Sequence, residues 1–164
     1  MLMTDNIIKV GMADLKHRCH PSVLVTLGLG SCVGIALYDY KVKIIGLAHI
    51  MLPWSFQAKN NTNEAKFADT GIKLLLKNML TDGANIGRIS AKLAGGAQMF
   101  TFSGASDMMR IGQRNVEATK QVLQSLHIPV ISEDTGGNHG RTIELYSDDG
   151  RLMIKTIGFG VKYI

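Results

Sequence analysis

Residues 26–50 read TLGLGSCVGIALYDYKVKIIGLAHI, and this stretch decides the fold. It contains two apolar runs, Cys32–Tyr38 and Ile44–Ile50, which are typical of buried strands. The polar segment Asp39–Lys43 separates them, so we expect a turn there and an antiparallel hairpin. A glycine-rich segment precedes the first run and predicts a tight turn at the head of the hairpin.

The hairpin also predicts a reactive pair. Cys32 begins the first strand and His49 lies near the end of the second, so an antiparallel return makes the two residues neighbours. A thiol attacks only as the thiolate and therefore needs a base, usually a histidine. The small residues Gly30 and Ser31 let a substrate approach, and unpaired N–H groups nearby would stabilise an oxyanion. The residues alone leave a simpler alternative open, in which Cys32 is a buried hydrophobe and His49 caps a carbonyl.

Outward from the hairpin, further strands and two helices are expected. The other strands are short apolar runs bounded by Gly, Asp or Pro, namely Val23–Leu27, Ser90–Ala94, Val130–Glu133, Thr142–Tyr146 and Leu152–Ile157. Apolar residues at steps of three and four predict helices near Glu64–Met79 and Ile111–Leu126. The stretch Pro53–Asn63 is expected to be an exposed loop, with Trp54 and Phe56 either packed beneath it or in contact with a partner. Strands around two amphipathic helices indicate an α/β or α+β layered domain.

The composition restricts the class of protein. A chain of 164 residues with 46% hydrophobic and 19% charged residues fits one packed domain over residues 1–164. The net charge of +5 favours acidic partners, but aromatic residues are only 6% and the basic ones are dispersed, so nucleic-acid binding is not expected. The segment Met1–Met12 lacks the apolar core of a signal peptide, and no apolar run reaches the roughly 20 residues that span a bilayer. We expect a cytoplasmic protein without membrane insertion, whose Cys19 and Cys32 are free thiols.

Three other motifs have weaker functional interpretations. The run His17-Arg18-Cys19-His20 holds three possible metal ligands, but adjacent residues seldom converge on one ion, so no metal site is expected. Gly28-Leu29-Gly30 lacks the third glycine of a dinucleotide fingerprint. The glycine-dense stretch 136–141 is expected to be a hairpin loop with positive φ angles. In an alternative, functional interpretation of this stretch, His139 or Arg141 lines a pocket.

Six blocks follow one another in order along nearly the whole chain. They are Thr26–Cys32, His49–Pro53, Lys66–Asp69, Lys92–Ala97, Ile111–Asn115 and Gly136–Arg141. Together they resemble the CheD family, the chemoreceptor glutamine deamidases of bacterial and archaeal chemotaxis. Two departures are small: Phe67 stands where many relatives have tyrosine, and Ala94 where many have an aromatic residue.

The resemblance implies a three-layer α/β/α sandwich with a mixed sheet, similar in its core to the cytotoxic necrotizing factor toxins, which deamidate a glutamine of a host protein. It places the family's nucleophile on Cys32, its histidine on His49 and its assisting threonine on Thr26. The residues expected to bind the substrate or the oxyanion are Gly30, Ser31 and Arg141.

The implied function is hydrolysis of glutamine side chains in methyl-accepting chemotaxis receptors through a Cys–His thioester, with receptor methylesterase activity as a natural side reaction. Neither a metal nor an organic cofactor is needed. The expected partners are the cytoplasmic helices of the receptors and the CheC phosphatase. A helical substrate favours an open, shallow cleft with a partly exposed Cys32. Two alternatives stay open, an adaptor that acts through contact alone and a general cysteine protease or amidase.

Overall fold

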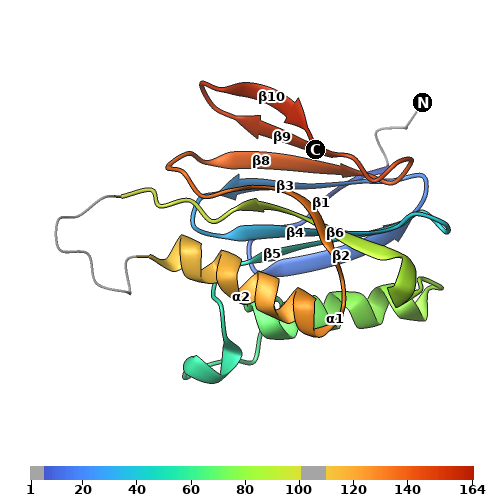
Figure 1. Cartoon of the computed structure of the whole chain (residues 1–164), viewed down its shortest axis with the longest axis horizontal. Helices are drawn as coiled ribbons and strands as arrows, with labels where there is room; N and C mark the ends of the chain where they lie inside the picture. Colours follow the sequence, from blue (N-terminus) through green and yellow to red (C-terminus); the bar gives the residue numbers. More distant parts are fainter. Residues whose placement is uncertain (1–5, 101–109) are drawn as a thin grey trace.

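The computed structural model describes residues 6–100 and 110–164, which form two β-sheets and a layer of helices (Figure 1). The strands of sheet A, in spatial order, are β1 (Ile7–Lys9), β3 (Val23–Leu29), β8 (Arg141–Tyr146), β9 (Leu152–Thr156) and β10 (Gly160–Tyr163). Those of sheet B are β2 (Asp14–Cys19), β5 (Ile44–Ile50), β4 (Val33–Asp39), β6 (Ile89–Gly95) and β7 (Val130–Thr135). The helices are α1 (Ala68–Thr81) and α2 (Ile111–Ser125), with short 3-10 turns at η2 (Ser55–Gln57), η3 (Glu64–Lys66) and η4 (Ile86–Arg88). Residues 1–5 and 101–109 of the predicted single domain, and with them the start of the Met1–Met12 segment, lie outside the described residues.

The predicted hairpin is confirmed and lies at the centre of sheet B. Its strands β4 and β5 pair antiparallel, from Val33 opposite Ile50 to Asp39 opposite Ile44. Every residue of β5 and nearly every residue of β4 is buried. Strands that are apolar on both faces are covered on both sides, so the hairpin forms the middle of the molecule.

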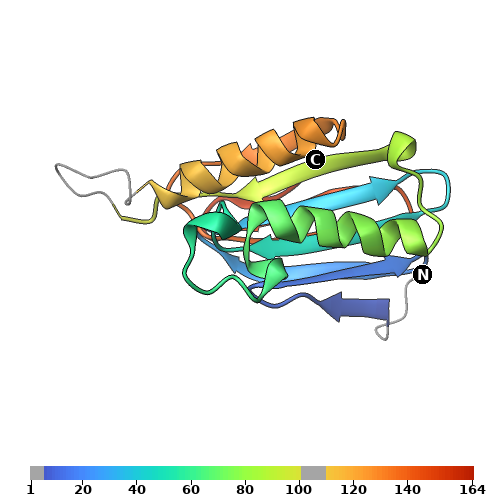
Figure 2. The same ribbon diagram turned by 90° about the horizontal axis from the view of Figure 1, so that it is seen from below.

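Different layers cover the two faces of sheet B. On one face, even-numbered residues of β5 such as Ile44 and Ile50 share a core with α1 and α2. On the other face, Ile45 and Leu47 share a second core with sheet A. Figure 2, seen from below, shows both helices lying over the strands of sheet B. The hairpin is therefore enclosed between a sheet and a pair of helices.

The order of layers is sheet, sheet, helices, which differs from the expected α/β/α sandwich. The α/β class and the mixed sheets are confirmed, because β1 runs parallel to β3 and β6 parallel to β7 among otherwise antiparallel pairs. Apolar residues on both faces of β5 indicate cover on both sides but do not specify whether a helix or a strand provides it. In the described residues, sheet A takes the place that the prediction gave to helices. The expected likeness to the toxins stays a prediction.

The expected strands and helices are present, with corrected boundaries. The sequence missed β1, β2 and β10, which are short or carry charged residues. Helix α1 begins at Ala68 rather than Glu64, because Phe67 is extended, with φ −114° and ψ 146°, and bridges to Leu52. In the loop that follows β5, Trp54 packs against the core, whereas Phe56 is exposed.

The glycine-dense stretch 136–140 differs from the expected hairpin loop. It connects β7 in sheet B to β8 in sheet A, so it crosses from one sheet to the other. Gly136 and Gly137 adopt φ angles of +82° and +70°, as predicted. The sequence identified the backbone requirement of this turn but not the elements that it joins.

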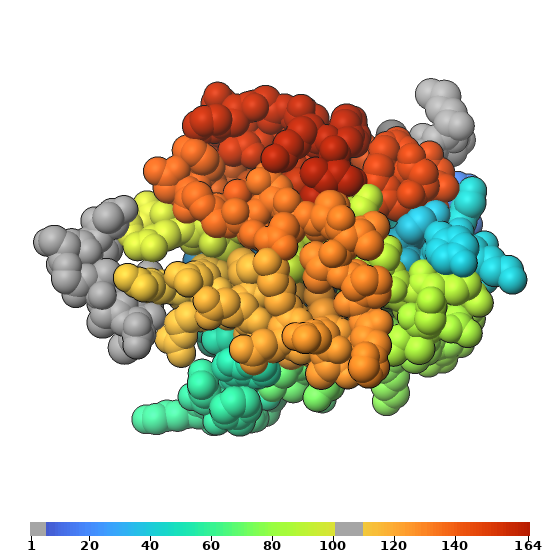
Figure 3. Space-filling model, in the orientation of Figure 1, coloured from blue at the N-terminus to red at the C-terminus, as the bar shows by residue number. Residues whose placement is uncertain are grey.

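The helices are amphipathic, as predicted. Residues of α1 at steps of three and four, among them Ile72, Leu75 and Met79, are buried. Figure 3 shows α2 lying across one face of the molecule beneath the C-terminal strands. Among the residues that the structure describes, neither helix has the length and the apolar character that crossing a bilayer demands.

Candidate active site

Cys32 and His49 lie on the same face of sheet B. Cys32 ends the short connection that leaves β3 in sheet A and enters β4 in sheet B. Alternate residues of β4, such as Ala36, face sheet A, and Cys32 continues this alternation and packs in the same core. His49 has the same parity in β5 as Leu47, which also faces sheet A. Both side chains therefore point into the space between the sheets, at the open end of the hairpin.

The register of the hairpin makes the two residues diagonal rather than direct neighbours. Gly34, not Cys32, lies opposite His49. The predicted pairing is thus shifted by two residues, and a shift by an even number keeps a side chain on the same face. Diagonal positions of an antiparallel pair are roughly 7–8 Å apart at Cα and closer at Cβ. Gly34 leaves room here, since a Cβ on it would lie 2.6 Å from Ile143 Cδ1.

Hydrogen bonds fix the tautomer of His49. The Thr26 hydroxyl lies 2.7 Å from His49 Nδ1 and 2.7 Å from the carbonyl oxygen of Val10. A carbonyl oxygen only accepts, so the single hydroxyl hydrogen goes to Val10, and Nδ1–H must donate to Thr26. The proton therefore sits on Nδ1, and Nε2 carries a free lone pair. Among the described residues, this buried Nε2 has no hydrogen-bond partner.

Burial favours the neutral forms of both side chains. His49 is fully buried, and this burial lowers its pKa below the ordinary value of 6.5. Cys32 is 7% exposed, and burial raises the pKa of its thiol, although a hydrogen bond from its own N–H acts in the opposite direction. At neutral pH both the Cys32 thiol and the His49 imidazole are therefore neutral, and the two do not form a preformed ion pair. Such a neutral pair suits general-base catalysis.

The thiol is more buried than the sequence predicted. The segment after β6 lies over the connection that carries it: Gly96 N–H donates to Cys32 O and Ala97 N–H donates to Gly30 O, both at 2.8 Å. The side chain of Met99 lies close to Gly30, since a Cβ on that glycine would approach Met99 Cγ to 3.3 Å. These contacts cover a residue that was expected to be partly exposed.

Glycines in two of the sequence blocks make this close packing possible. Gly95 has a φ of +108°, and a Cβ there would lie 2.3 Å from Cys32 O. A Cβ on Gly112, in the first turn of α2, would lie 2.4 Å from Ala97 O. Both contacts are shorter than a side chain tolerates, so a larger residue would push β6 or α2 away from the site.

The turn before Cys32 supplies candidate oxyanion donors. Gly30 N–H donates to Gly28 O at 3.1 Å. In the part of the chain that the structure describes, neither Ser31 N–H nor Cys32 N–H donates to a backbone or side-chain oxygen. Both donors belong to the turn that carries the thiol, which makes them candidates to stabilise the negative charge on a reacting carbonyl.

Arg141 is near this end of the molecule, but its guanidinium is engaged with the chain. The residue is 7% exposed, and its Nη2 donates to Gly136 O at 2.9 Å. Its Nη1 donates to Gly95 O at 3.3 Å, and its Nε lies 3.4 Å from Asp134 Oδ2. These contacts join the crossing between the sheets to the end of β6. They give Arg141 a structural role, and its expected contact with the substrate stays a prediction.

Sequence reasoning missed Asn115, which lies in α2 and is fully buried. Its Nδ2 donates to Ser31 O at 2.9 Å and to Met51 O at 3.0 Å. A signal was present, since Asn115 lies four residues before Thr119 and seven before Val122, in line with the apolar stripe of the helix. An amide within an apolar stripe indicates a buried hydrogen-bonding role.

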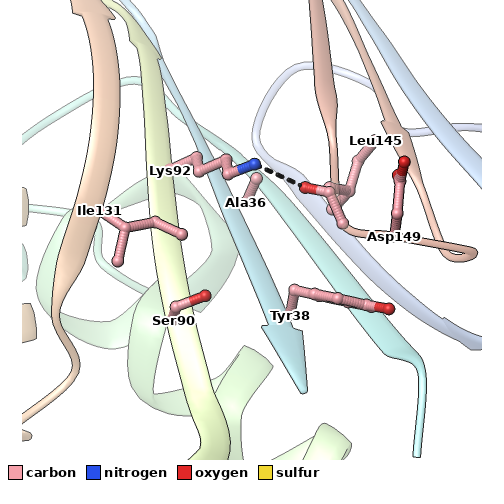
Figure 4. A pocket seen from close by; sticks show the side chains of 8 residues that line it. Ala36, Tyr38, Ser90, Lys92, Ile131, Leu145 and Asp149 are labelled. Carbon is pink, nitrogen blue, oxygen red and sulfur yellow. Dashed lines mark hydrogen bonds between the residues drawn. The ribbon is translucent and has the colours of Figure 1, made fainter. Parts of the chain in front are cut away.

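Cavities also lie away from the Cys–His pair. A groove of about 320 Å³ runs between α2 and the crossing turn, next to Gly96 and Gln98. A smaller cavity of about 50 Å³ lies between the sheets, where Lys92 donates to Gly150 O at 3.0 Å (Figure 4). Among the described residues, no group of three His, Cys, Asp or Glu side chains could hold a metal ion. Both Cys19 and Cys32 are free thiols.

Comparisons with known proteins identify the family. A family model described as CheD chemotactic sensory transduction matches residues 51–156. The probable chemoreceptor glutamine deamidase CheD of Caldanaerobacter subterraneus subsp. tengcongensis is 60% identical over 99% of this chain and 100% of its own. The chemoreceptor glutamine deamidase CheD of Halalkalibacterium halodurans is 52% identical over 98% of this chain and 99% of its own. A solved structure, the hypothetical protein YfiH of Bacillus licheniformis, aligns with 74% of this chain and 50% of its own at 17% identity and a TM-score of 0.47, too weak a likeness to bear on the fold. The chain belongs to the CheD family.

Proposed function

We propose that this protein deamidates glutamine side chains of chemoreceptors, with Cys32 as the nucleophile and His49 as the base. The observation that carries the proposal is the hydrogen-bonded series from His49 through Thr26 to Val10. It leaves the lone pair of His49 Nε2 unpartnered among the described residues, on the face of sheet B that Cys32 shares. A buried nitrogen without a partner is costly in a structural residue and is expected in a catalytic base.

In the first half of the reaction, His49 Nε2 takes the proton of the Cys32 thiol. The sulfur then attacks the carboxamide carbon, and the carbonyl π electrons move to the oxygen, which the N–H groups of Ser31 and Cys32 stabilise. When the carbonyl re-forms, the C–N bond breaks, and His49 delivers its proton to the departing ammonia. A thioester between Cys32 and the substrate remains.

In the second half, water hydrolyses the thioester. His49 Nε2 takes a proton from the water while the water oxygen attacks the thioester carbon. The C–S bond then breaks. The Cys32 thiolate recovers the proton from His49, and the substrate is released as glutamate. The balance is one amide and one water in, one carboxylic acid and one ammonia out. In this scheme Thr26 holds the imidazole in the required tautomer.

The relatives' names support a receptor as the substrate, because those proteins are called chemoreceptor glutamine deamidases. A receptor glutamate methyl ester would give the same thioester, so methylesterase activity follows from the same chemistry. Membership of the CheD family supports two further parts of the proposal, pairing with the CheC phosphatase and a cytoplasmic location. In the same proposal, Arg141 holds the crossing turn in place.

The test is a deamidation assay on cytoplasmic fragments of methyl-accepting chemotaxis receptors. We expect Cys32→Ala to reduce ammonia release by roughly 10⁴-fold or more, as removal of a nucleophile does. Mass spectrometry of the receptor digest should show the mass gain of a CONH₂ to COOH exchange with the parent protein only. Cys19→Ala is the control, because that thiol is exposed and remote, and its rate should equal that of the parent.

Two outcomes would overturn the proposal, and a third would show that an adaptor role dominates in signalling. Full activity of Cys32→Ala would exclude the nucleophile. Cleaved receptor chains would indicate a protease. If Cys32→Ala still binds the receptor and restores signalling, the protein acts as an adaptor.

A further inference from the structure

The amide of Asn115 joins the two segments that carry the reactive pair. Its Nδ2 donates to the carbonyl of Ser31, directly before Cys32, and to that of Met51, two residues after His49. Both neighbours are carbonyl oxygens, which only the NH₂ group can satisfy, so the orientation of the amide follows from its contacts. Replacing Asn115 would release both carbonyls at once.

Asn115 approaches from the side of sheet B away from the thiol. Helix α2 packs on the face that Val33 and Ile35 of β4 share with the helices. Cys32 packs on the opposite face, in the core with sheet A. The side chain of Asn115 therefore contacts the backbone of the site from the face opposite the thiol. It can affect the chemistry only by changing the orientation of the Ser31–Cys32 peptide.

The geometry of a peptide bond carries that effect to the other face. In a trans peptide, the C=O of one residue and the N–H of the next lie in one plane and point in opposite directions. Because Asn115 holds Ser31 O towards α2, the N–H of Cys32 points away from α2, towards the side where the thiol lies.

We propose that Asn115 is a positioning residue that orients the Ser31–Cys32 peptide so that Cys32 N–H points at the reacting carbonyl oxygen. The inference rests on the proposed function, because it assigns this N–H to the oxyanion. Leucine in this place fills a similar volume but donates no hydrogen bond. The peptide would then be free to rotate, and the oxyanion would lose a preorganised donor.

Alkylation of Cys32 by iodoacetamide tests the orientation without requiring deamidase activity. The Cys19→Ala background leaves Cys32 as the one thiol, and the rate is followed against pH. We expect Asn115→Leu to slow alkylation at pH 8 by about tenfold and to shift the rate profile to higher pH, because the Cys32 N–H dipole is no longer held on the side where the thiolate forms. Asn115→Ser keeps one hydroxyl donor, should give an intermediate shift, and carries the test if Asn115→Leu does not fold.

Thr119→Val is the matched control. Thr119 is fully buried one turn further along α2, and its hydroxyl has no partner among the described residues. Its removal should leave the alkylation profile unchanged. A merely structural role of Asn115 would lower thermal stability without moving the profile, and that result would overturn the inference. An equal shift in Thr119→Val would also overturn it.

Deamidation kinetics separate this inference from the proposed function. If Asn115 orients the oxyanion donor, Asn115→Leu should lower kcat by roughly 10²-fold and leave KM nearly unchanged. If the parent protein releases no ammonia from receptor fragments, the proposed function fails, while the alkylation profiles still decide whether Asn115 orients the peptide. If the parent is active and Asn115→Leu alters neither kcat nor the profile, the inference alone fails.

Discussion

The two ends of the β4–β5 hairpin differ in how completely their buried polar groups are hydrogen-bonded. At the turn, the Asp39 carboxylate is fully buried and accepts hydrogen bonds from Arg88 Nε and from the backbone N–H groups of Lys41, Val42 and Asn85. At the open end, His49 Nε2 has no hydrogen-bond partner among the described residues, and the N–H groups of Ser31 and Cys32 donate to no oxygen there. The carboxylate at the turn is therefore fully hydrogen-bonded, whereas the groups at the open end can still form hydrogen bonds.

This difference indicates that the hairpin gains stability at the turn and keeps reactive groups at its open end. Burial raises the pKa of Asp39, but hydrogen bonds from Arg88 and the backbone outweigh it and hold the pKa below 3.8. The charge is therefore stabilised in the folded state. At the open end burial is not compensated in this way, so His49 and Cys32 are held in their neutral forms. Unsatisfied groups cost stability and are available to a substrate.

The largest stability effect is expected at the turn. Asp39→Ala removes the partner of Arg88 and leaves buried N–H groups unpaired, so the free energy of unfolding should fall by about 3 kcal/mol. The kcat of the folded fraction should not change. Urea unfolding and steady-state kinetics check the two statements.

Asp148→Ala is the control for this variant. Its carboxylate is also bonded to an arginine, Arg151, but its side chain is 46% exposed. The cost should be less than about 1 kcal/mol, as for a surface ion pair. An equal cost for both variants, or a loss of kcat in Asp39→Ala, would remove the distinction between the two ends.

An intermediate effect is expected at the open end. Thr26→Val keeps the shape of the side chain but breaks the hydrogen bonds to His49 and Val10. The imidazole is then free to adopt the wrong tautomer, so kcat should fall by about tenfold, while stability falls by about 1 kcal/mol. Thr142→Val on the neighbouring strand β8 should leave the rate unchanged. A Thr26→Val enzyme with parental kcat would show that Thr26 does not orient the base.

The smallest expected effect is that the stability contributions of His49 and Asp39 are lost in different pH ranges. His49 has a folded pKa below 6.5, so its neutral form contributes stability in full above pH 6.5 and loses it as the pH falls through the lowered pKa. Asp39 has a folded pKa below 3.8, so its contribution is complete above pH 3.8 and is lost only below it. The stability difference between the parent and Asp39→Ala should therefore stay constant down to about pH 4 and shrink below it.

The pH dependence of catalysis should follow the open end alone. Because the pKa of His49 is lowered, its base form persists below pH 6.5, and the acid limb of kcat/KM should lie below that value. A limb above pH 6.5 would contradict a neutral, buried His49. If the difference in free energy of unfolding between the parent and Asp39→Ala already shrinks near pH 6, the assignment of the lower pH range to Asp39 is contradicted.

Much of the central fold was predictable because its signals are local. The apolar run of β5 was placed with both ends correct, and the turn between β4 and β5 follows from the polar residues between two apolar runs. The hairpin also brought Cys32 and His49 to the same face, with an error of two residues in register. The layer order was not predictable, because burial of both faces does not specify the covering element. Strand β10 was missed because none of its residues is buried.

The sequence by itself determined the hairpin, the turn that carries Cys32 and the strand end that carries His49, because alternation along a strand and the length of a turn are properties of neighbouring residues. Only the tertiary structure decided how the groups that complete the site reach it. Thr26 reaches His49 from another sheet, 23 residues away in sequence, and Asn115 reaches Ser31 from a helix 84 residues away. No local period encodes such contacts, because they exist only once the two sheets and α2 have packed around the hairpin.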